Sequence, residues 1–217
     1  MRPTVESLSR VAPRVAFAAI LAAVMLVTRS AEPSVAEQRA RLPPPAKCED
    51  EVVGLWRSHQ YNEMFAEWTI FQLEIRRKKG SETELEGRIL NETWLGQKTD
   101  QEPGMCQGTV PWRFQVSMPA KGSYRNGEVS FQGTSWKLDK VVCGNLPTGF
   151  GYNLDHFTGK IDPAIQEFQS VNNDGGKAVN DPTVFRRVKC FDEGPEVRQP
   201  AHVDPPPFLP PNRTGGC

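Results

Sequence analysis

Residues 110–118 show the pattern that most constrains the fold of this chain, because apolar and polar side chains alternate there strictly. The apolar positions are Val110, Trp112, Phe114, Val116 and Met118, and each residue between them is polar or proline. Successive side chains of a β-strand point to opposite faces, so a period of two predicts a strand with one buried and one solvated face. Trp112, in phase with its apolar neighbours, is expected in the core.

The same period recurs in other segments. Apolar residues alternate over 71–75, the polar segment 76–82 predicts a turn, and the alternation resumes over 85–89, which together predict a β-hairpin. Only residues 60–67 show a pattern compatible with a short helix. Weaker patterns predict further strands near 51–57, 127–132, 135–142, 152–160, 165–171 and 183–190.

About nine short strands separated by glycine and proline, with hardly any helix, predict an all-β fold. We expect a single antiparallel barrel, or a barrel-like sandwich, of about eight to nine strands. The one-sided apolar pattern gives each strand a wet face. Closure into a barrel is favoured because it removes the exposed sheet edges that promote aggregation.

The chain begins with a segment typical of export. Within residues 1–30, three arginines precede or flank an uncharged apolar run at 15–27. This run is short for a membrane-spanning helix, which needs about 20 residues, but it suits the hydrophobic region of a secretory signal. We expect a signal peptide or, if it is not cleaved, a membrane anchor that would be the only contact with a membrane. The protein is then periplasmic, extracellular or associated with the cell envelope.

Proline content sets the predicted domain limits. Residues 31–47 are proline-rich and predict an extended linker, and residues 193–217 are proline-rich with a single aromatic residue and predict a disordered tail. One β-barrel-like domain is therefore expected over residues 48–192.

Five widely spaced cysteines, without a CxxC pair, favour disulfides in an exported protein over a zinc site. Cys217 lies on the predicted tail and has no assigned role. Two bridges are expected, with the pairing left open, among Cys48, Cys106, Cys143 and Cys190.

The charge balance excludes a class of partner. Lys plus Arg and Asp plus Glu number 26 each, so no basic field for nucleic acid exists. Only three histidines are present, and neither a metal site nor a cofactor is expected.

Residues 169–188 contain a GGK tripeptide and several Asn and Asp residues. Gly176-Lys177 is followed by Ala178 rather than Ser or Thr, so the phosphate-binding Walker pattern fails. Asn172 to Gly175 begins like a calcium loop, but the next acid is Asp181. Asp-Gly and Asn-Asp-Pro are turn formers, so we interpret the stretch as the connection of a hairpin between a strand ending near Val171 and one beginning near Thr183.

Gly54-Leu55-Trp56 in the first predicted strand and Arg186-Arg187 in the last resemble the calycin pattern of lipocalins, and avidin-like barrels also begin with a GxW strand. The resemblance implies a cup with a ligand cavity, with Trp56 at its floor and Arg186 or Arg187 stacked on its ring. A barrel filled by its own side chains is the alternative.

Tryptophans and tyrosines supply further candidates for binding, since aromatic walls suit small ligands. Trp94 is out of phase with Leu85 and Ile89, so we expect it to be exposed and available to a ligand. The predicted ligand-binding residues are Trp56, Trp94, Tyr152, Arg186 and Arg187.

The segment 149–162 holds the only arrangement that suggests catalysis. It contains Asp155, His156 and Asp162, but a strand over 152–160 would turn Tyr152 and His156 to one face and Asp155 to the other. No nucleophile motif accompanies them, so no catalytic residue is expected.

The sequence thus predicts an exported, non-enzymatic, β-barrel-like protein that binds a small apolar molecule or a cell-envelope component such as a protein. One alternative is a structural or interaction module with a filled core that acts through its rim loops. The other is a hydrolase using Asp155, Asp162 or His156.

Overall fold

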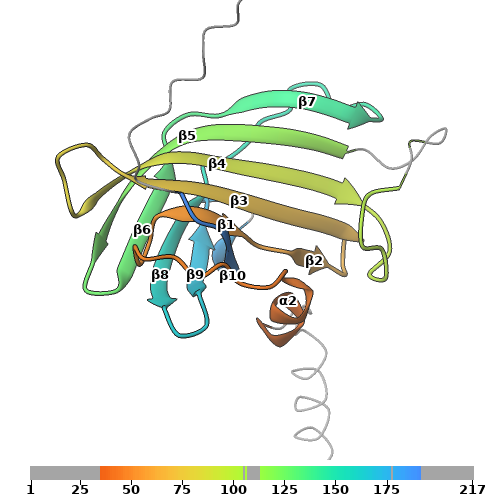
Figure 1. Cartoon of the computed structure of the whole chain (residues 1–217). Coiled ribbons are helices and arrows are strands. Elements are labelled where there is room, and N and C mark those ends of the chain that lie inside the picture. Colours follow the sequence, from red (N-terminus) through yellow and green to blue (C-terminus); the bar gives the residue numbers. More distant parts are fainter. Residues whose placement is uncertain (1–34, 105, 107–112, 177, 192–217) are drawn as a thin grey trace, which may run out of the picture.

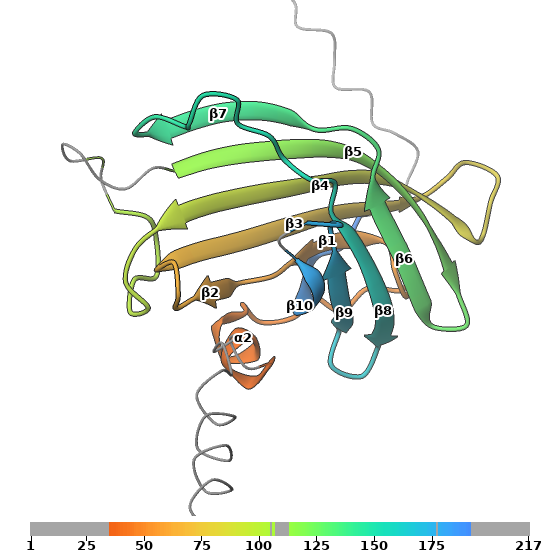
Figure 2. The same ribbon diagram turned by 180° about the vertical axis from the view of Figure 1, so that it is seen from behind.

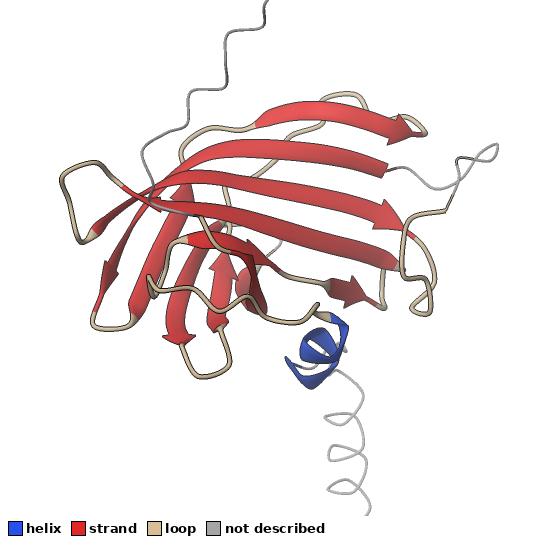
Figure 3. Cartoon of the chain, in the orientation of Figure 1, coloured by secondary structure: helices blue, strands red, loops and turns tan. Residues whose placement is uncertain are grey.

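The computed structural model describes residues 35–104, 106, 113–176 and 178–191, which form one short helix and a curved antiparallel sheet (Figure 1; Figure 3). The elements are α2 (Val35–Arg41), β1 (Gly54–Arg57), β2 (Gln60–Asn62), β3 (Glu67–Arg77), β4 (Glu84–Leu95), β5 (Arg113–Arg125), β6 (Glu128–Gly133), β7 (Lys137–Cys143), β8 (His156–Asp162), β9 (Glu167–Asn173) and β10 (Val179–Lys189).

The sheet closes on itself. Its neighbours follow the order β1-β10-β9-β8-β6-β5-β4-β3, and β1 pairs with both β10 and β3, which closes an eight-strand barrel. The strand β2 continues β1 along β3, and β7 continues β6 along β5. Figure 2 shows the barrel from behind, with β6, β8 and β9 in front. The predicted fold class, a single antiparallel all-β barrel, is confirmed.

Three glycines allow the strands to curve. A Cβ atom at Gly87, Gly122 or Gly159 would lie 1.8–2.0 Å from a backbone oxygen of the neighbouring strand. Any larger residue would push the paired strands apart at these points. Glycine kinks of this kind are a common means of bending a sheet into a barrel.

One half of the barrel interior is filled. Apolar side chains pack together next to the β3–β4, β5–β6 and β8–β9 turns, and they come from all eight strands of the ring, whereas β2 and β7 contribute none. The predicted alternation is confirmed, since Phe71, Leu73 and Ile75 of β3 are all buried in this cluster. On β5, Phe114, Val116 and Met118 are buried as well. The filled half gives the barrel a closed end.

The short helix with which the pattern of residues 60–67 is compatible does not form. Residues 60–62 form β2 and pair with residues 67–69 of β3, so sheet hydrogen bonds override the local helical pattern. A tight turn joins the two strands, and Ala66 has a φ of 47° in it.

The extended linker expected over 31–47 contains α2, which packs on the barrel. The side chain of Gln38 is buried, donates a hydrogen bond of 2.8 Å to the carbonyl of Pro182 and accepts one of 3.0 Å from the amide of Val184. This segment is therefore joined to the barrel by specific contacts. No helix in the described ranges has the length and apolar character of a membrane span.

The hairpin expected around residues 169–188 is confirmed. Strands β9 and β10 pair from Val179↔Asn173 to Arg186↔Glu167. At their turn, the Asp174 carboxylate accepts hydrogen bonds from the amides of Gly176 and Ala178, at 2.7 and 2.9 Å. Asp174 therefore stabilises the turn.

Several predictions lie outside the described residues. These are the export segment 1–30, the tail 193–217, and the positions of Val110, Trp112 and Cys217.

Candidate functional site

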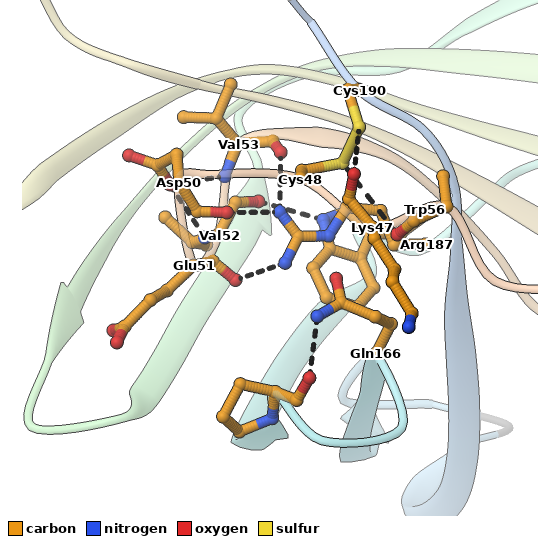
Figure 4. The surroundings of a disulfide bond; sticks show 12 residues. Lys47, Cys48, Asp50, Glu51, Val52, Val53, Trp56, Gln166, Arg187 and Cys190 are labelled. Atoms are coloured by element: carbon orange, nitrogen blue, oxygen red, sulfur yellow. Dashed lines mark hydrogen bonds between the residues drawn. A yellow bond between two sulfur atoms is a disulfide. The ribbon is translucent and has the colours of Figure 1, made fainter.

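The closed end of the barrel is sealed by Trp56 and Arg187 (Figure 4). The Trp56 ring is fully buried, and its Nε1 donates a hydrogen bond of 2.8 Å to the carbonyl of Val52. The Arg187 guanidinium carbon lies 4.8 Å from the centroid of that ring, which is within range of a cation–π contact. Of the two arginines proposed for this stacking, Arg187 makes it.

Arg187 also ties the chain that precedes β1 to the last strand. Its guanidinium donates to the carbonyls of Val53 at 3.0 Å, Glu51 at 2.9 Å and Asp50. Burial lowers the pKa of Arg187. The side chain thus uses its charge to satisfy three backbone oxygens at the closed end.

Arg186 points to a different set of partners. Its guanidinium lies 2.6 Å from the carboxylate of Glu167, and it donates to the carbonyls of Leu42 and Pro43 at 3.4 and 3.3 Å. Neither arginine nor Trp56 lines the cavity described next, so these three predicted binding residues lie apart from it.

Two disulfides join the four predicted cysteines. Cys48 bonds to Cys190, 142 residues away and next to Arg187, and Cys106 bonds to Cys143, 37 residues away. The first links the segment before β1 to the end of β10 (Figure 4). Disulfides persist in non-reducing compartments, so both bonds indicate such an environment.

The half of the barrel away from Trp56 holds a cavity of about 460 Å³. Its wall is formed by β2, β3, β4, β5 and β9, by residues 150–153 and 155, and by Asp174, Ala178, Val179 and Asp181. Aromatic rings of Phe71, Phe114, Phe150 and Tyr152 line it, and the rings of Phe114 and Phe150 meet edge to face at 5.2 Å.

Polar side chains line the cavity beside these rings. Asn91 and Thr93 of β4 point inward and are buried, and the Thr93 hydroxyl donates to the Asn91 carbonyl oxygen at 2.8 Å. Sequence reasoning missed both residues. They are in phase with Leu85 and Ile89, so the inward face of β4 changes from apolar to polar along its length, and that change was the available signal.

Asp155 is the most deeply buried of the described acids that line the cavity, with 2% of its surface exposed. Its Oδ2 accepts a hydrogen bond of 2.8 Å from the Tyr152 hydroxyl, and its Oδ1 accepts one of 2.7 Å from the Asn172 amide. Burial raises the pKa of Asp155 to about 7, although both hydrogen bonds act in the opposite direction. The carboxyl group therefore changes protonation near neutral pH.

Acidic side chains line the described part of the cavity wall. Among the described residues that line it, four carry carboxylates and none is Lys, Arg or His. The four are Glu67, Asp155, Asp174 and Asp181. At the rim, Met64 and Val179 are 69% and 59% exposed, so the entrance has apolar edges.

The strand expected over 152–160 begins only at His156, which corrects the predicted placement of Tyr152. Residues 149–155 are irregular, and Tyr152 contacts Asp155 instead of lying on the face of His156. The separation predicted for Asp155 and His156 holds, because the His156 Nε2 lies 2.9 Å from the Ser130 hydroxyl in a separate outer depression. Asp162 binds the Ala164 amide in the β8–β9 turn. The three residues of the hydrolase alternative are not brought together.

Trp94 is buried, with 1% exposed, so the expectation of an exposed ring is wrong. It lies on the outer face of the barrel as its phase indicated, but it stacks on Trp68 with ring centroids 5.4 Å apart. The segment after β4 folds back over the pair, since the Trp68 indole donates to the Gln97 carbonyl at 3.1 Å. Arg41, at the end of α2, covers Trp68 at 4.5 Å from its ring centroid.

Comparison with known proteins gives no match: no family model matches the chain, and neither a curated protein nor a solved structure does. The eight-strand antiparallel barrel is consistent with a calycin-like fold. Conclusions about the site therefore depend on its geometry.

Proposed function

We propose that this protein is an exported, non-enzymatic binding protein of calycin type that holds a small molecule in the cavity at the open half of its barrel. The observation that carries this proposal is the cavity itself, with a volume of about 460 Å³ above a filled core. Ligand pockets commonly measure about 300–1,000 Å³ and combine apolar walls with a few polar groups.

The lining supports an amphiphilic ligand more than a purely apolar one. Phe71, Phe114 and Phe150 offer a surface for an apolar body. Asp155, Asn91 and Asn172 have hydrogen-bonding capacity beyond the partners they already bind, and an entirely apolar molecule would leave that capacity unused. A ligand with one polar end satisfies both parts of the wall.

Export is supported by two independent features. The arginines and apolar run within residues 1–30 are typical of a secretory signal. The bonds Cys48–Cys190 and Cys106–Cys143 need a compartment that does not reduce them. The open cavity favours ligand binding over an interaction module with a filled core, and the separation of Asp155, His156 and Asp162 disfavours the hydrolase.

Binding in the cavity is tested with a neutral fluorescent naphthylamine dye and a variant that fills the space. Thr93 points inward and is buried, so Thr93→Phe would occupy the cavity. Thr158 lies on the other face of β8 from the core residue Phe157, so Thr158→Phe adds the same ring outside. Dye fluorescence should saturate at one dye per chain for the wild type and Thr158→Phe and should be lost in Thr93→Phe.

Circular dichroism and thermal unfolding establish that both variants fold. If Thr93→Phe does not fold, Thr93→Leu takes its place, because this smaller side chain also reduces the space in the cavity, and weaker dye binding is expected. Equal dye binding by wild type and a folded Thr93→Phe variant would contradict the proposal. If dye binding does depend on the cavity, native mass spectrometry of protein purified from its own host would show the mass of the natural ligand.

A further inference from the structure

We infer that the ligand of this cavity is an organic cation, a molecule with an amine or ammonium head and an aromatic or aliphatic body, and that Asp155 pairs with its charge. This inference rests on the proposed function and names the class of molecule that the same cavity takes.

Asp155 has no basic partner among the described residues. A buried carboxylate is strongly unfavourable unless it is paired. The contacts of the Asp155 carboxylate in the described part of the chain are the Tyr152 hydroxyl and the Asn172 amide, and both donors are neutral. A carboxylate can accept about four hydrogen bonds, so Asp155 has acceptor capacity left for a ligand.

A second buried carboxylate in the same chain shows what is missing. Glu167 is fully buried, and two arginines neutralise it: Arg39 at 2.8 Å and Arg186 at 2.6 Å. The protein thus supplies two cations of its own where it buries Glu167. At Asp155, which faces a cavity instead of packed protein, an incoming cation would take the place of those arginines.

The described wall of the cavity carries carboxylates and no basic side chain. Glu67 and Asp181 have contacts of their own, and Asp174 is engaged in the β9–β10 turn, so we assign the direct contact to Asp155 alone. The ionised Asp155 carboxylate contributes negative potential, which a cavity with low-dielectric walls concentrates. This potential attracts cations and repels anions.

Aromatic rings line the cavity wall beside Asp155. Tyr152, whose hydroxyl touches Asp155, and the neighbouring Phe150 both line the cavity. Aromatic faces attract ammonium groups by about 0.5–2 kcal/mol, depending on desolvation. They also accept the apolar body of the ligand, whose far end would reach the exposed Met64 and Val179 at the rim.

Protonation of Asp155 adds a pH dependence. Among the described residues, the ionisable groups that bear on the site are Tyr152 of the same segment, Asp174 after β9, Glu67 of β3 and Asp181 of β10, and none of these is cationic. Burial raises the pKa of Asp155 to about 7. An ammonium ion needs the ionised form, so affinity for an amine should increase as the pH rises from 6 to 8, while affinity for a neutral ligand should not.

The experiment presents two apolar bodies, phenylethyl and n-octyl, each with three heads: a primary amine, an alcohol and a carboxylate. Isothermal titration calorimetry at pH 8 on the full mature chain should give an amine affinity at least about tenfold higher than that of the matching alcohol, as expected for one charge-assisted hydrogen bond. The carboxylates should bind most weakly.

Asp155→Asn removes the charge and keeps a side chain that can still bond to Tyr152 and Asn172. It should lower amine affinity at least about tenfold and leave alcohol affinity unchanged. Glu128→Gln is the matched control, because Glu128 is an exposed acid on β6 that does not line the cavity, and it should change neither affinity.

The inference is overturned if neither amine binds more tightly than its alcohol, or if folded Asp155→Asn binds amines as well as the wild type does. In either case the proposed function still stands as long as the neutral dye occupies the cavity and Thr93→Phe excludes it. Loss of cavity-dependent dye binding is the separate result that removes the proposed function.

Discussion

The guanidinium carbon of Arg187 lies 4.8 Å from the centre of the Trp56 ring, and the two side chains close one end of the barrel. One residue is in the first strand and the other is in the last. The contact therefore fastens the pair β1 and β10, whose register is irregular between Leu55 and Trp56.

Arg187→Lys should lower the free energy of unfolding by about 3 kcal/mol, because a lysine cannot reach the three carbonyls of residues 50, 51 and 53 together and leaves buried oxygens unpaired. Urea denaturation measures the change. Arg88→Lys is the control, since Arg88 forms one exposed pair with Glu74 and should change stability by less than about 0.5 kcal/mol. Equal effects of the two substitutions would show that Arg187 contributes only its charge.

The two disulfides should contribute unequally to stability. In the chain-entropy account, a bridge that closes a longer loop restricts the unfolded chain more, and the loops here span 142 and 37 residues. In a Cys217→Ser background, replacing Cys48 and Cys190 with serine should destabilise the protein by about 1 kcal/mol more than replacing Cys106 and Cys143. Chemical denaturation of the two double variants gives the comparison, and the reverse order would refute the loop-length argument.

Asp155 should make the protein less stable as the pH rises through the neutral range. Burial raises its pKa from 3.8 to about 7, so between these values the folded protein holds a proton that the unfolded chain has released. The free energy of unfolding therefore falls from about pH 4 to about pH 7 and then levels off. Relative to the wild type, Asp155→Asn should gain up to about 4 kcal/mol between pH 4 and pH 8.

The comparison is made as a difference between the two proteins at each pH, because His59 titrates in the opposite sense. Burial lowers the pKa of His59 to about 4, so its contribution to stability is present above pH 6.5 and is lost as the pH falls toward 4. This term is common to wild type and variant and cancels. A constant difference across the range would mean that Asp155 is not perturbed.

Trp94→Ala should cost about 4 kcal/mol of unfolding free energy, since it removes a buried ring that stacks on Trp68. Trp136 is the control, because it is 37% exposed and makes one edge contact with Phe150 and one tilted contact with Tyr152, with ring centroids 6.0 and 6.3 Å apart. Trp136→Ala should cost about 1 kcal/mol. Similar losses from both substitutions would contradict the burial of Trp94.

The alternation of side chains was enough to predict strands with one buried face, and the cost of exposed sheet edges favoured their closure into a barrel. The alternation around Phe71 and Leu73 predicts their strand without any information about β4. The failures occurred where distant contacts decide. Residues 60–62 became a strand because β3 offered hydrogen bonds, and Trp94 became buried because Arg41 and the segment around Gln97 cover the outer face.

The closed end was predicted more fully than the cavity. A GxW strand and a late arginine are local patterns, and Arg187 meets Trp56 as their resemblance implied. The cavity depends on three strands whose inward residues change from apolar to polar along their length, and Thr69, Asn91 and Asn172 meet in its wall. Register between strands is a long-range property, so no single segment of the sequence reveals that these changes coincide.

The bond between Cys48 and Cys190 has a mechanical consequence. Tension applied to the chain before Cys48 and after Cys190 crosses from one to the other through the sulfur atoms, so the strands between them bear no load. Such a pull would separate from the barrel only what lies outside the bridge, which in the described part of the chain is α2 with the stretch up to Lys47 on one side and Phe191 on the other. The strands that form the wall of the cavity would keep their pairing.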